Sequence, residues 1–314
     1  MNAYVAVTDA DWYSYLSSQE NLDEVNFWQP NPWTGRFGVL RRGEPLLFKL
    51  KAPHNAIAGV GFFERYVTLP FSLAWDAFGH KNGAADKQAM WERIARLRND
   101  RPAWWADFTI GCLMLVEPCF FPPDQWVSAP SSFSPNIVRG KGYDLAQSEG
   151  RALWDQVVTA MATACAPSLA AETPLEQPSL FGGYAEPTTI RRRLGQGTFQ
   201  VLVTEAYRRS CAITGEKALP ALDAAHIRPF SELETHTVRN GLLLRSDVHR
   251  LFDRGYITVT PEHRVEASNR MKEDFNDGDN YLALHGRVIA LPERSDERPS
   301  PEFLRWHNEE CFRG

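Results

Sequence analysis

Apolar and polar residues alternate in several short runs of the N-terminal half, which is the pattern of strands with one buried face. Strands are predicted at 3–8, 44–50, 56–63 and, as a short pair, within 109–121; helices are predicted at 12–16, 71–78 and 87–97. Asp9 or Asp11 is suited to cap the first of these helices. Several strands with few helices favour a small curved sheet or barrel, so the fold class is predicted as α+β.

The C-terminal half contains two apolar runs, 222–230 and 238–244, with a polar turn between them. Two such runs predict a two-stranded ribbon. Directly after the ribbon, Ser246 is a good N-cap and Gly255 a good C-terminal stop. A short helix is therefore predicted over 246–254, and the three elements together form a ββα unit.

A change of composition separates the two halves. Residues 161–190 are rich in Ala, Pro, Thr, Ser and Gly, which is typical of a linker. We therefore expect one domain at 1–160, a linker at 161–190 and a second domain at 191–314.

Three polar residues of the C-terminal half suit the hydrolysis of a phosphodiester. His226 falls on the first strand of the predicted ribbon, Asn240 near the second, and His249 on the predicted helix. A neutral imidazole accepts a proton from water near pH 7, and a hard cation neutralises charge on the phosphate. The window therefore offers a base, a metal ligand and an amide that braces the turn.

The strings Ala-His-Ile-Arg-Pro at 225–229 and Asn-Gly-Leu-Leu-Leu-Arg-Ser-Asp-Val-His at 240–249 resemble the HNH, or ββα-metal, nuclease family over residues 195–260. The resemblance implies that His226 is the general base, that Asn240 ties the ribbon together by hydrogen bonds, and that His249 binds a divalent ion. Mg²⁺ or Mn²⁺ fits better than zinc if carboxylate and water complete the coordination. The chain is accordingly expected to be a metal-dependent endonuclease.

The sequence departs from the family pattern at two places. Many members carry a second metal ligand directly before the base, where this chain has Ala225; Asp223, on the same face of the predicted strand, is the nearest carboxylate to replace it. Many relatives also hold a structural zinc with paired cysteines, but Cys211 is followed by Gly215 where a partner thiol would stand. No zinc knuckle is expected, and a degenerate, inactive nuclease remains an alternative.

Charge is distributed unevenly along the chain. The formal net charge is −5, whereas residues 191–250 contain ten Lys or Arg and six acidic residues, a net +4. Arg228 and Arg245 stand close to the two histidines and are candidates for holding the scissile strand, Arg245 with a catalytic role. Arg191 and Arg192 suit either a phosphate clamp or the solvated end of a linker.

Length and composition leave room for two cores. The chain has 314 residues, of which 43% are hydrophobic and 23% charged. It contains no apolar run long enough to cross a bilayer and does not begin like a signal peptide, so no membrane association and a cytoplasmic location are expected. Its five cysteines lack metal-binding spacing and are expected as reduced thiols.

The N-terminal unit resembles the PUA-like superfamily, which includes the EVE, ASCH and SRA modules. The resemblance rests on the order of its segments: an opening strand and helix, a Gly-Glu turn at 43–44 that leads into a strand, and a glycine-rich strand at 56–63. It implies an aromatic pocket that holds a flipped, modified nucleobase.

Residues 26–33 supply the candidates for that pocket. Phe27, Trp28 and Trp33 offer stacking surfaces. The amides of Asn26, Gln29 and Asn31 are suited to read the hydrogen-bonding edge of a base. Ordinary core packing is the alternative, because most of the 10 Trp and 18 Phe must be buried somewhere. Alternative wall residues are Trp75, Trp126, His54 and Asn55.

Both halves together predict a modification-dependent restriction endonuclease. The N-terminal domain would bind 5-methyl- or 5-hydroxymethylcytosine in double-stranded DNA, and the tethered HNH domain would cut a nearby phosphodiester at raised local concentration. Cutting both strands needs two active sites or two visits by one, which favours a homodimer. A ligand-gated anti-phage nuclease and a DNA-binding protein with an inactive HNH domain are the alternatives.

Overall fold

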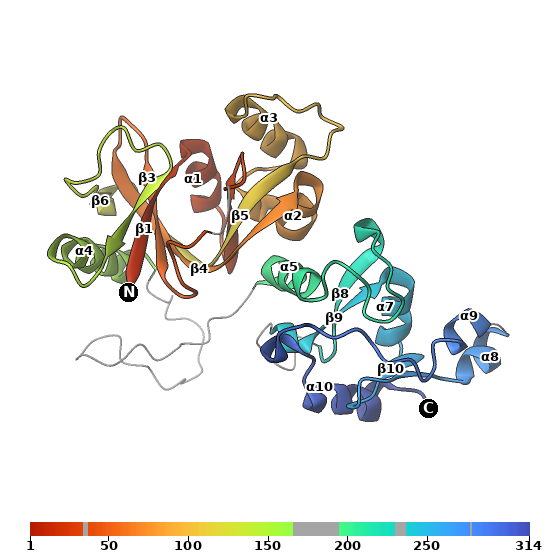
Figure 1. The fold of residues 1–314 in the computed structure, drawn as a ribbon. Helices are drawn as coiled ribbons and strands as arrows, with labels where there is room; N and C mark the ends of the chain where they lie inside the picture. The colour runs from red at the N-terminus through yellow and green to blue at the C-terminus, as the bar shows by residue number, and fades with distance from the viewer. Residues whose placement is uncertain (34–36, 166–194, 230–236, 277) are drawn as a thin grey trace. The chain divides into compact units, whose positions relative to one another are not determined.

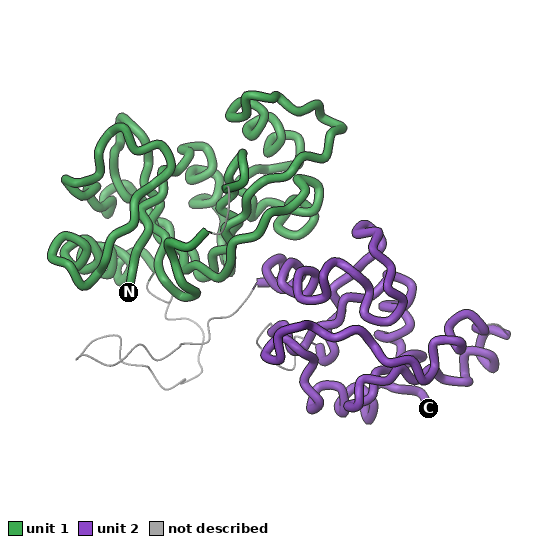
Figure 2. Tube along the Cα trace, viewed as in Figure 1, with its two compact units in different colours: residues 1–193 green, residues 194–314 purple. Residues whose placement is uncertain are grey.

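The chain forms two compact units, residues 1–193 and 194–314 (Figure 2). Both mix strands and helices, which confirms the predicted α+β class (Figure 1). The computed structural model describes residues 1–33, 37–165, 195–229, 237–276 and 278–314. Helix α4 (Ser148–Ala164) occupies the first positions of the expected linker, and most of the rest of 161–190 lies outside the described residues.

A seven-stranded sheet forms the centre of the N-terminal unit. Its strands lie in the order β2-β5-β4-β3-β1-β7, and β6 pairs with β4. Their bounds are β1 Asn2–Thr8, β2 Glu24–Gln29, β3 Pro45–Leu50, β4 Ala56–Pro70, β5 Thr109–Phe120, β6 Val127–Ser128 and β7 Gly140–Asp144. β1 and β3 run parallel, whereas the other pairs are antiparallel. The strands predicted at 3–8, 44–50 and 56–63 are thereby confirmed.

Two strands differ from the sequence pattern. The segment 109–121, expected as two short strands, is the single strand β5; the expected break is a bulge at Glu117 (φ 48°), beside which the register with β4 shifts. β2 was not predicted, although residues 24–27 alternate polar and apolar side chains. The alternation does not mark a solvent face here, because the polar Glu24 and Asn26 are buried as well.

Three helices of the N-terminal unit follow the prediction: α1 Ala10–Ser17, α2 Phe71–Phe78 and α3 Lys87–Leu97. Helix α4 and the short 3₁₀ turns η1 Gly79–Asn82 and η2 Pro123–Gln125 were not predicted. Asp9 is the N-cap of α1, because its carboxylate accepts hydrogen bonds from the backbone N–H groups of Asp11 and Trp12. The choice left open between Asp9 and Asp11 is thus decided by the local backbone.

Two cysteines of this unit depart from the expected reduced state. Cys119 of β5 and Cys165, directly after α4, form a disulfide with a Cα–Cα distance of 6.1 Å. Cys112, Cys211 and Cys311 carry thiols. The expectation of five reduced thiols is therefore wrong for this pair, because the fold brings together two residues whose sequence separation of 46 carries no signal.

The C-terminal unit is built on the predicted ββα arrangement. Its elements are α5 Gln196–Ala206, η3 Leu219–Ala221, β8 Leu222–His226, η4 Val238–Asn240, β9 Gly241–Arg245, α7 Ser246–Asp253, β10 Ile257–Val259, β11 Val265–Ala267, α8 Arg270–Phe275, α9 Asp279–Leu282, η5 Ser295–Glu297, α10 Pro301–Trp306 and the π-helical turn η6 His307–Cys311. β8 and β9 pair antiparallel, which confirms the ribbon, although both strands are shorter than predicted. α7 follows β9 without a loop.

Ser246 is not the N-cap of α7, as the sequence predicted. The cap position is Arg245, with no side-chain cap, and Ser246 is the first helical residue. Its hydroxyl instead donates a hydrogen bond to the carbonyl of Ala221, at 3.2 Å. This acceptor is within reach because the start of β8 lies beside the start of α7. The local sequence does not reveal that contact.

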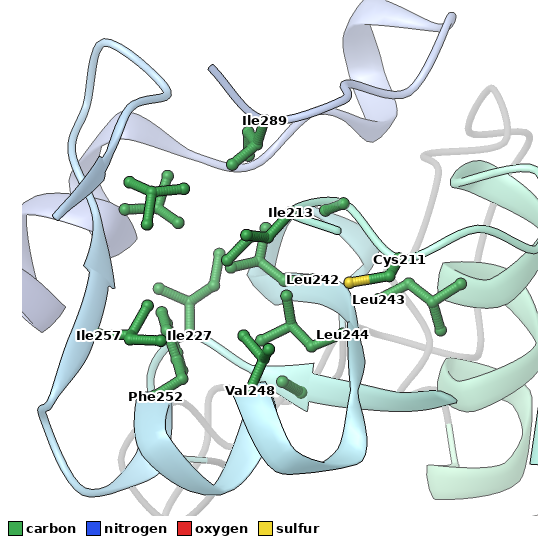
Figure 3. Packing of buried hydrophobic residues seen from close by; sticks show 14 of the residues in the cluster. Cys211, Ile213, Ile227, Leu242, Leu243, Leu244, Val248, Phe252, Ile257 and Ile289 are labelled. Carbon is green, nitrogen blue, oxygen red and sulfur yellow. The ribbon is translucent and has the colours of Figure 1, made fainter. Parts of the chain in front are cut away.

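A hydrophobic core fixes β9 against α7 (Figure 3). Leu242 and Leu244 of β9 and Val248 and Phe252 of α7 are all fully buried. The buried Cys211 thiol accepts a hydrogen bond from the backbone N–H of Arg245, at 3.2 Å. The end of β9 is therefore held by packing and by this hydrogen bond.

Candidate active site

His226 is the last residue of β8 and faces Gly241 across the ribbon. Its imidazole stacks on the ring of Phe199 from α5, with ring centroids 4.0 Å apart and planes 8° apart. Phe199 is itself buried, so it is a rigid support. A strand end and a buried aromatic ring together fix the orientation that the predicted base requires.

Asn240 braces the turn that follows His226, as the sequence predicted. Its fully buried amide accepts a hydrogen bond from the N–H of Arg228 at 2.9 Å and donates one to the carbonyl of the same residue at 2.8 Å. Its own carbonyl accepts from the N–H of Ile227, at 2.9 Å. The amide therefore closes the chain around residue 228 through main-chain atoms alone.

His249 lies between two carboxylates on the first turns of α7. Its Nδ1 is 3.3 Å from Asp223 of β8, and its Nε2 is 3.4 Å from Asp253 at the end of the same helix. Burial lowers the pKa of His249, but the hydrogen bonds and charges of Asp253 and Asp223 outweigh burial and raise the pKa above its ordinary value.

Asp253 was missed in the sequence, although a signal was present. It stands four residues after His249, and this spacing places two side chains on one face of a helix. Asp223, expected to replace the ligand missing at Ala225, is indeed directed at His249. One imidazole thus has a carboxylate at each ring nitrogen.

These side chains meet in one cavity of about 450 Å³. Its lining includes His226, His249, Asp223 and Asp253. The two imidazoles, separated by 22 positions of sequence, therefore open onto the same space. The cavity therefore brings two imidazoles and two carboxylates together.

The donors at His249 suit a hard divalent cation in their chemistry. Two carboxylates and an imidazole match Mg²⁺ or Mn²⁺, which favour oxygen ligands. Within the described residues, no three His, Cys, Asp or Glu side chains already surround a common point. Binding an ion here therefore requires a nitrogen of His249 to exchange its carboxylate contact for the ion.

Arg245 is engaged elsewhere. Its guanidinium forms a two-pronged ion pair with Asp247, at 2.6 and 2.7 Å, and Tyr281 also donates to this carboxylate. The hydrogen bond from Arg245 is the main cause that lowers the pKa of Asp247 to about 2. Arg245 does not line the cavity, so its catalytic role stays a prediction without a contact to support it.

The other predicted phosphate-binding arginines divide into two cases. Arg228 is not among the cavity-lining residues, but its guanidinium lies 5.4 Å from the ring centroid of Trp306 in α10, which is one of them. Arg191 and Arg192 lie outside the described residues. Only Arg228 therefore has a described position beside the candidate site.

His307 packs beneath the cavity as a neutral histidine. It is 2% exposed; its Nε2 lies 3.2 Å from the carbonyl of Phe252 and must donate to it, so its Nδ1 accepts from the hydroxyl of Thr258 at 2.8 Å. Burial lowers its pKa to about 4. The unfolded chain, with an ordinary pKa near 6.5, binds the proton more readily than the folded one.

We expect this histidine to make stability dependent on pH. Its contribution is complete above pH 6.5 and falls as the pH drops towards 4, by up to about 3 kcal/mol for a shift of this size. Urea unfolding of the parent and of His307→Gln at pH 7, 6 and 5, followed by circular dichroism, measures the difference. Equal slopes against pH for the two proteins would show that His307 does not carry the effect.

The four predicted base-binding residues do not converge on one pocket. The fully buried Asn26 donates a hydrogen bond from its Nδ2 to Oδ1 of Asn82, at 2.8 Å. Trp33 packs on Phe37, with ring centroids 4.8 Å apart. Phe27 and Trp28 do line a cavity of about 270 Å³. Asn26 and Trp33 are not among its lining residues, so two of the four predicted residues share this cavity.

The cavity beside Phe27 and Trp28 has further walls. Gln29 and Asn31, whose amides were expected beside the aromatic residues, line it, and so do Trp12 of α1 and the cationic Lys51 and Arg139, which were not predicted as parts of this pocket. Of the alternative residues, Trp126 pairs with His54, and Asn55 accepts a hydrogen bond from Lys49; these and Trp75 are not in its lining. The missing signal was the packing of α1 over β2, which only the fold supplies.

Comparisons with known proteins agree with the motif at His226 and His249. Residues 211–260 match a family model described as HNH endonuclease. No curated protein matches the chain. One similar solved structure is ASCH from Zymomonas mobilis, with a TM-score of 0.32 and 10% identity; the match covers 50% of this chain and 94% of that one. Another is the modification-dependent TagI restriction endonuclease, with a TM-score of 0.28 and 14% identity; the match covers 99% of this chain and 81% of that one.

The helices of the described residues include none long and apolar enough to cross a membrane. The motif, the ββα fold around it and the family match all fall on the same segment. Residues 211–260 thus carry a segment that matches the HNH endonuclease family.

Proposed function

We propose that the protein is a metal-dependent, modification-dependent DNA endonuclease. The observation that carries the proposal is the shared cavity of His226 and His249, with Asp223 and Asp253, inside an HNH segment. Its position on the ββα fold fits hydrolysis of a phosphodiester. Double-stranded DNA is the proposed substrate, and a modified cytosine the proposed signal.

In the proposed mechanism, His226 takes a proton from the attacking water. Stacking on Phe199 keeps its ring in place, and the Asn240 clamp keeps the following turn closed. His249, together with Asp223 or Asp253, would hold Mg²⁺ or Mn²⁺. When bound, the ion supplies charge neutralisation at the phosphate and the leaving oxygen.

The cavity lined by Phe27 and Trp28 is the proposed reader of the modified base. Aromatic rings suit stacking on a flipped base, and Asn31 offers both a donor and an acceptor. Lys51 and Arg139 are exposed and suit the flanking phosphates. A homodimer that cuts both strands, and a cytoplasmic location, are parts of the same proposal.

One duplex in four forms tests this function. Unmodified, 5-methylated, 5-hydroxymethylated and glucosylated versions are incubated with the full chain and Mg²⁺ or Mn²⁺, and cleavage is followed on gels. We expect efficient cutting of at least one modified form and little cutting of the unmodified one. Equal cutting of all forms would contradict the reader, and no cutting with either ion would favour an inactive HNH domain.

Charge-removing variants at the rim test the location of the reader. Lys51→Ala with Arg139→Ala should reduce the cutting of the modified duplex and leave slow cutting of unmodified DNA unchanged, because both cations line the N-terminal cavity. Arg151→Ala, at an exposed position of α4, is the matched control. Loss of both activities in parallel would place these cations outside modification-specific recognition.

A further inference from the structure

The cavity that holds His226 and His249 has a second wall outside the segment 211–260. Gln196 and Gln200 of α5 and Trp306 of α10 form part of this wall. The two glutamines are four residues apart and therefore share one face of α5. Trp306 is half-buried and is the only tryptophan among residues 194–314. We call Gln196, Gln200 and Trp306 the neutral wall.

The two sides of the cavity differ in charge. The catalytic side carries the carboxylates of Asp223 and Asp253 beside the imidazoles, whereas the neutral wall offers two amides and an indole. Carboxylates suit a cation and, through it, a phosphate. Amides both donate and accept hydrogen bonds, and an indole face stacks on any base. The neutral wall thus matches a nucleoside better than a phosphate.

Structural links hold the neutral wall in a fixed relation to the catalytic side. Phe199 lies between Gln196 and Gln200 in α5 and carries the imidazole of His226 on its ring. On the other side, Arg228 lies over Trp306, while the Asn240 amide clamps the main chain of Arg228. The glutamines therefore flank the residue that supports the imidazole of His226, and Trp306 contacts the residue that Asn240 clamps in the following turn.

We propose that Gln196, Gln200 and Trp306 bind the deoxynucleoside next to the scissile phosphate. The inference rests on the proposed nuclease function and adds a subsite to it. The cavity volume of about 450 Å³ lies in the range of small-ligand sites and leaves space for a nucleoside beside the phosphate. Because stacking is tolerant of sequence, this subsite contributes to substrate affinity without selecting a particular base.

Steady-state cleavage with matched substrates tests the subsite. The cut is first mapped on the modified duplex, and an abasic nucleotide is then placed on either side of it. For the intact duplex, Trp306→Ala should raise KM roughly fivefold or more with little change in kcat, as expected for a lost stacking contact. Gln200→Ala should raise KM roughly two- to tenfold, as expected for a lost hydrogen bond.

Combining the Trp306→Ala substitution with an abasic nucleotide distinguishes base stacking from a general structural role of Trp306. One abasic position should raise KM for the parent but not further for Trp306→Ala, because both changes remove the same contact. Trp306→Phe should retain most of the affinity and its dependence on the base. Trp105→Ala, which removes a tryptophan that is 87% exposed in the other unit, is the matched control. Additive effects of the abasic nucleotide and Trp306→Ala would overturn the inference.

A binding measurement separates this inference from the nuclease proposal. Calorimetry compares thymidine 5′-monophosphate with 2-deoxyribose 5-phosphate, each with Mg²⁺, on the full chain. The parent should bind the nucleotide at one site that the sugar phosphate does not occupy. Loss of this site in Trp306→Ala supports the subsite, even if the parent cuts no DNA. Identical binding by parent and variant overturns it, whereas failure of cleavage alone contradicts only the nuclease proposal.

Discussion

Replacing His226 with Ala is expected to lower the single-turnover rate of DNA cleavage roughly 100- to 10,000-fold, the range for losing a general base. DNA affinity should not change, because the imidazole stacks on Phe199 and adds no charge to the DNA-binding surface when neutral. Rapid-quench cleavage of the modified duplex gives the rate, and fluorescence anisotropy gives the affinity.

His285→Ala is the control for this variant. His285 is an exposed histidine of the same unit, outside the lining of the cavity. It should cut at the parent rate. If His226→Ala cuts as fast as His285→Ala, the assignment of the base has to be given up.

Replacing both Asp223 and Asp253 with Asn is expected to abolish metal-dependent cleavage. The structure directs both carboxylates at His249, at 3.3 and 3.4 Å, so each is a candidate to share the ion with that imidazole. Each single variant should raise the Mg²⁺ concentration for half-maximal rate about tenfold or more, as for groups that support a metal site. The larger rise identifies the carboxylate that is the ligand.

Direct binding of Mn²⁺, measured by electron paramagnetic resonance, checks this result without turnover. Glu262→Gln removes an exposed carboxylate of the same unit outside the cavity lining and should bind the ion as the parent does. Unchanged Mn²⁺ affinity in the double variant would rule out these carboxylates as the metal site. The pKa of His249 should also fall in both single variants, because each carboxylate raises it.

The nuclease site was largely accessible from the sequence because its parts are local. His226, Asn240 and His249 lie within 24 residues, at the end of β8, in the turn η4 directly before β9, and on α7, which follows β9 without a loop. Asp253 could have been found by the same reasoning, at helical spacing from His249. Arg245 shows the limit, since the sequence does not reveal that Asp247 engages its guanidinium.

The N-terminal cavity was less accessible because its walls come from distant segments. The amide of Asn26 was expected to face a base, but it bonds to Asn82, which is 56 residues away. Trp12, Lys51 and Arg139 meet Phe27 and Trp28 only after α1 and β7 have taken their places around the sheet. Strand alternation indicates which residues are buried, but not which buried residues share a cavity.

The clamp made by Asn240 has a consequence for how such an enzyme can diversify. Asn240 holds residue 228 only through its main chain, so this clamp by itself places no demand on the side chain at that position. The residue beside Trp306 can therefore vary without loss of the clamp that closes the turn after His226.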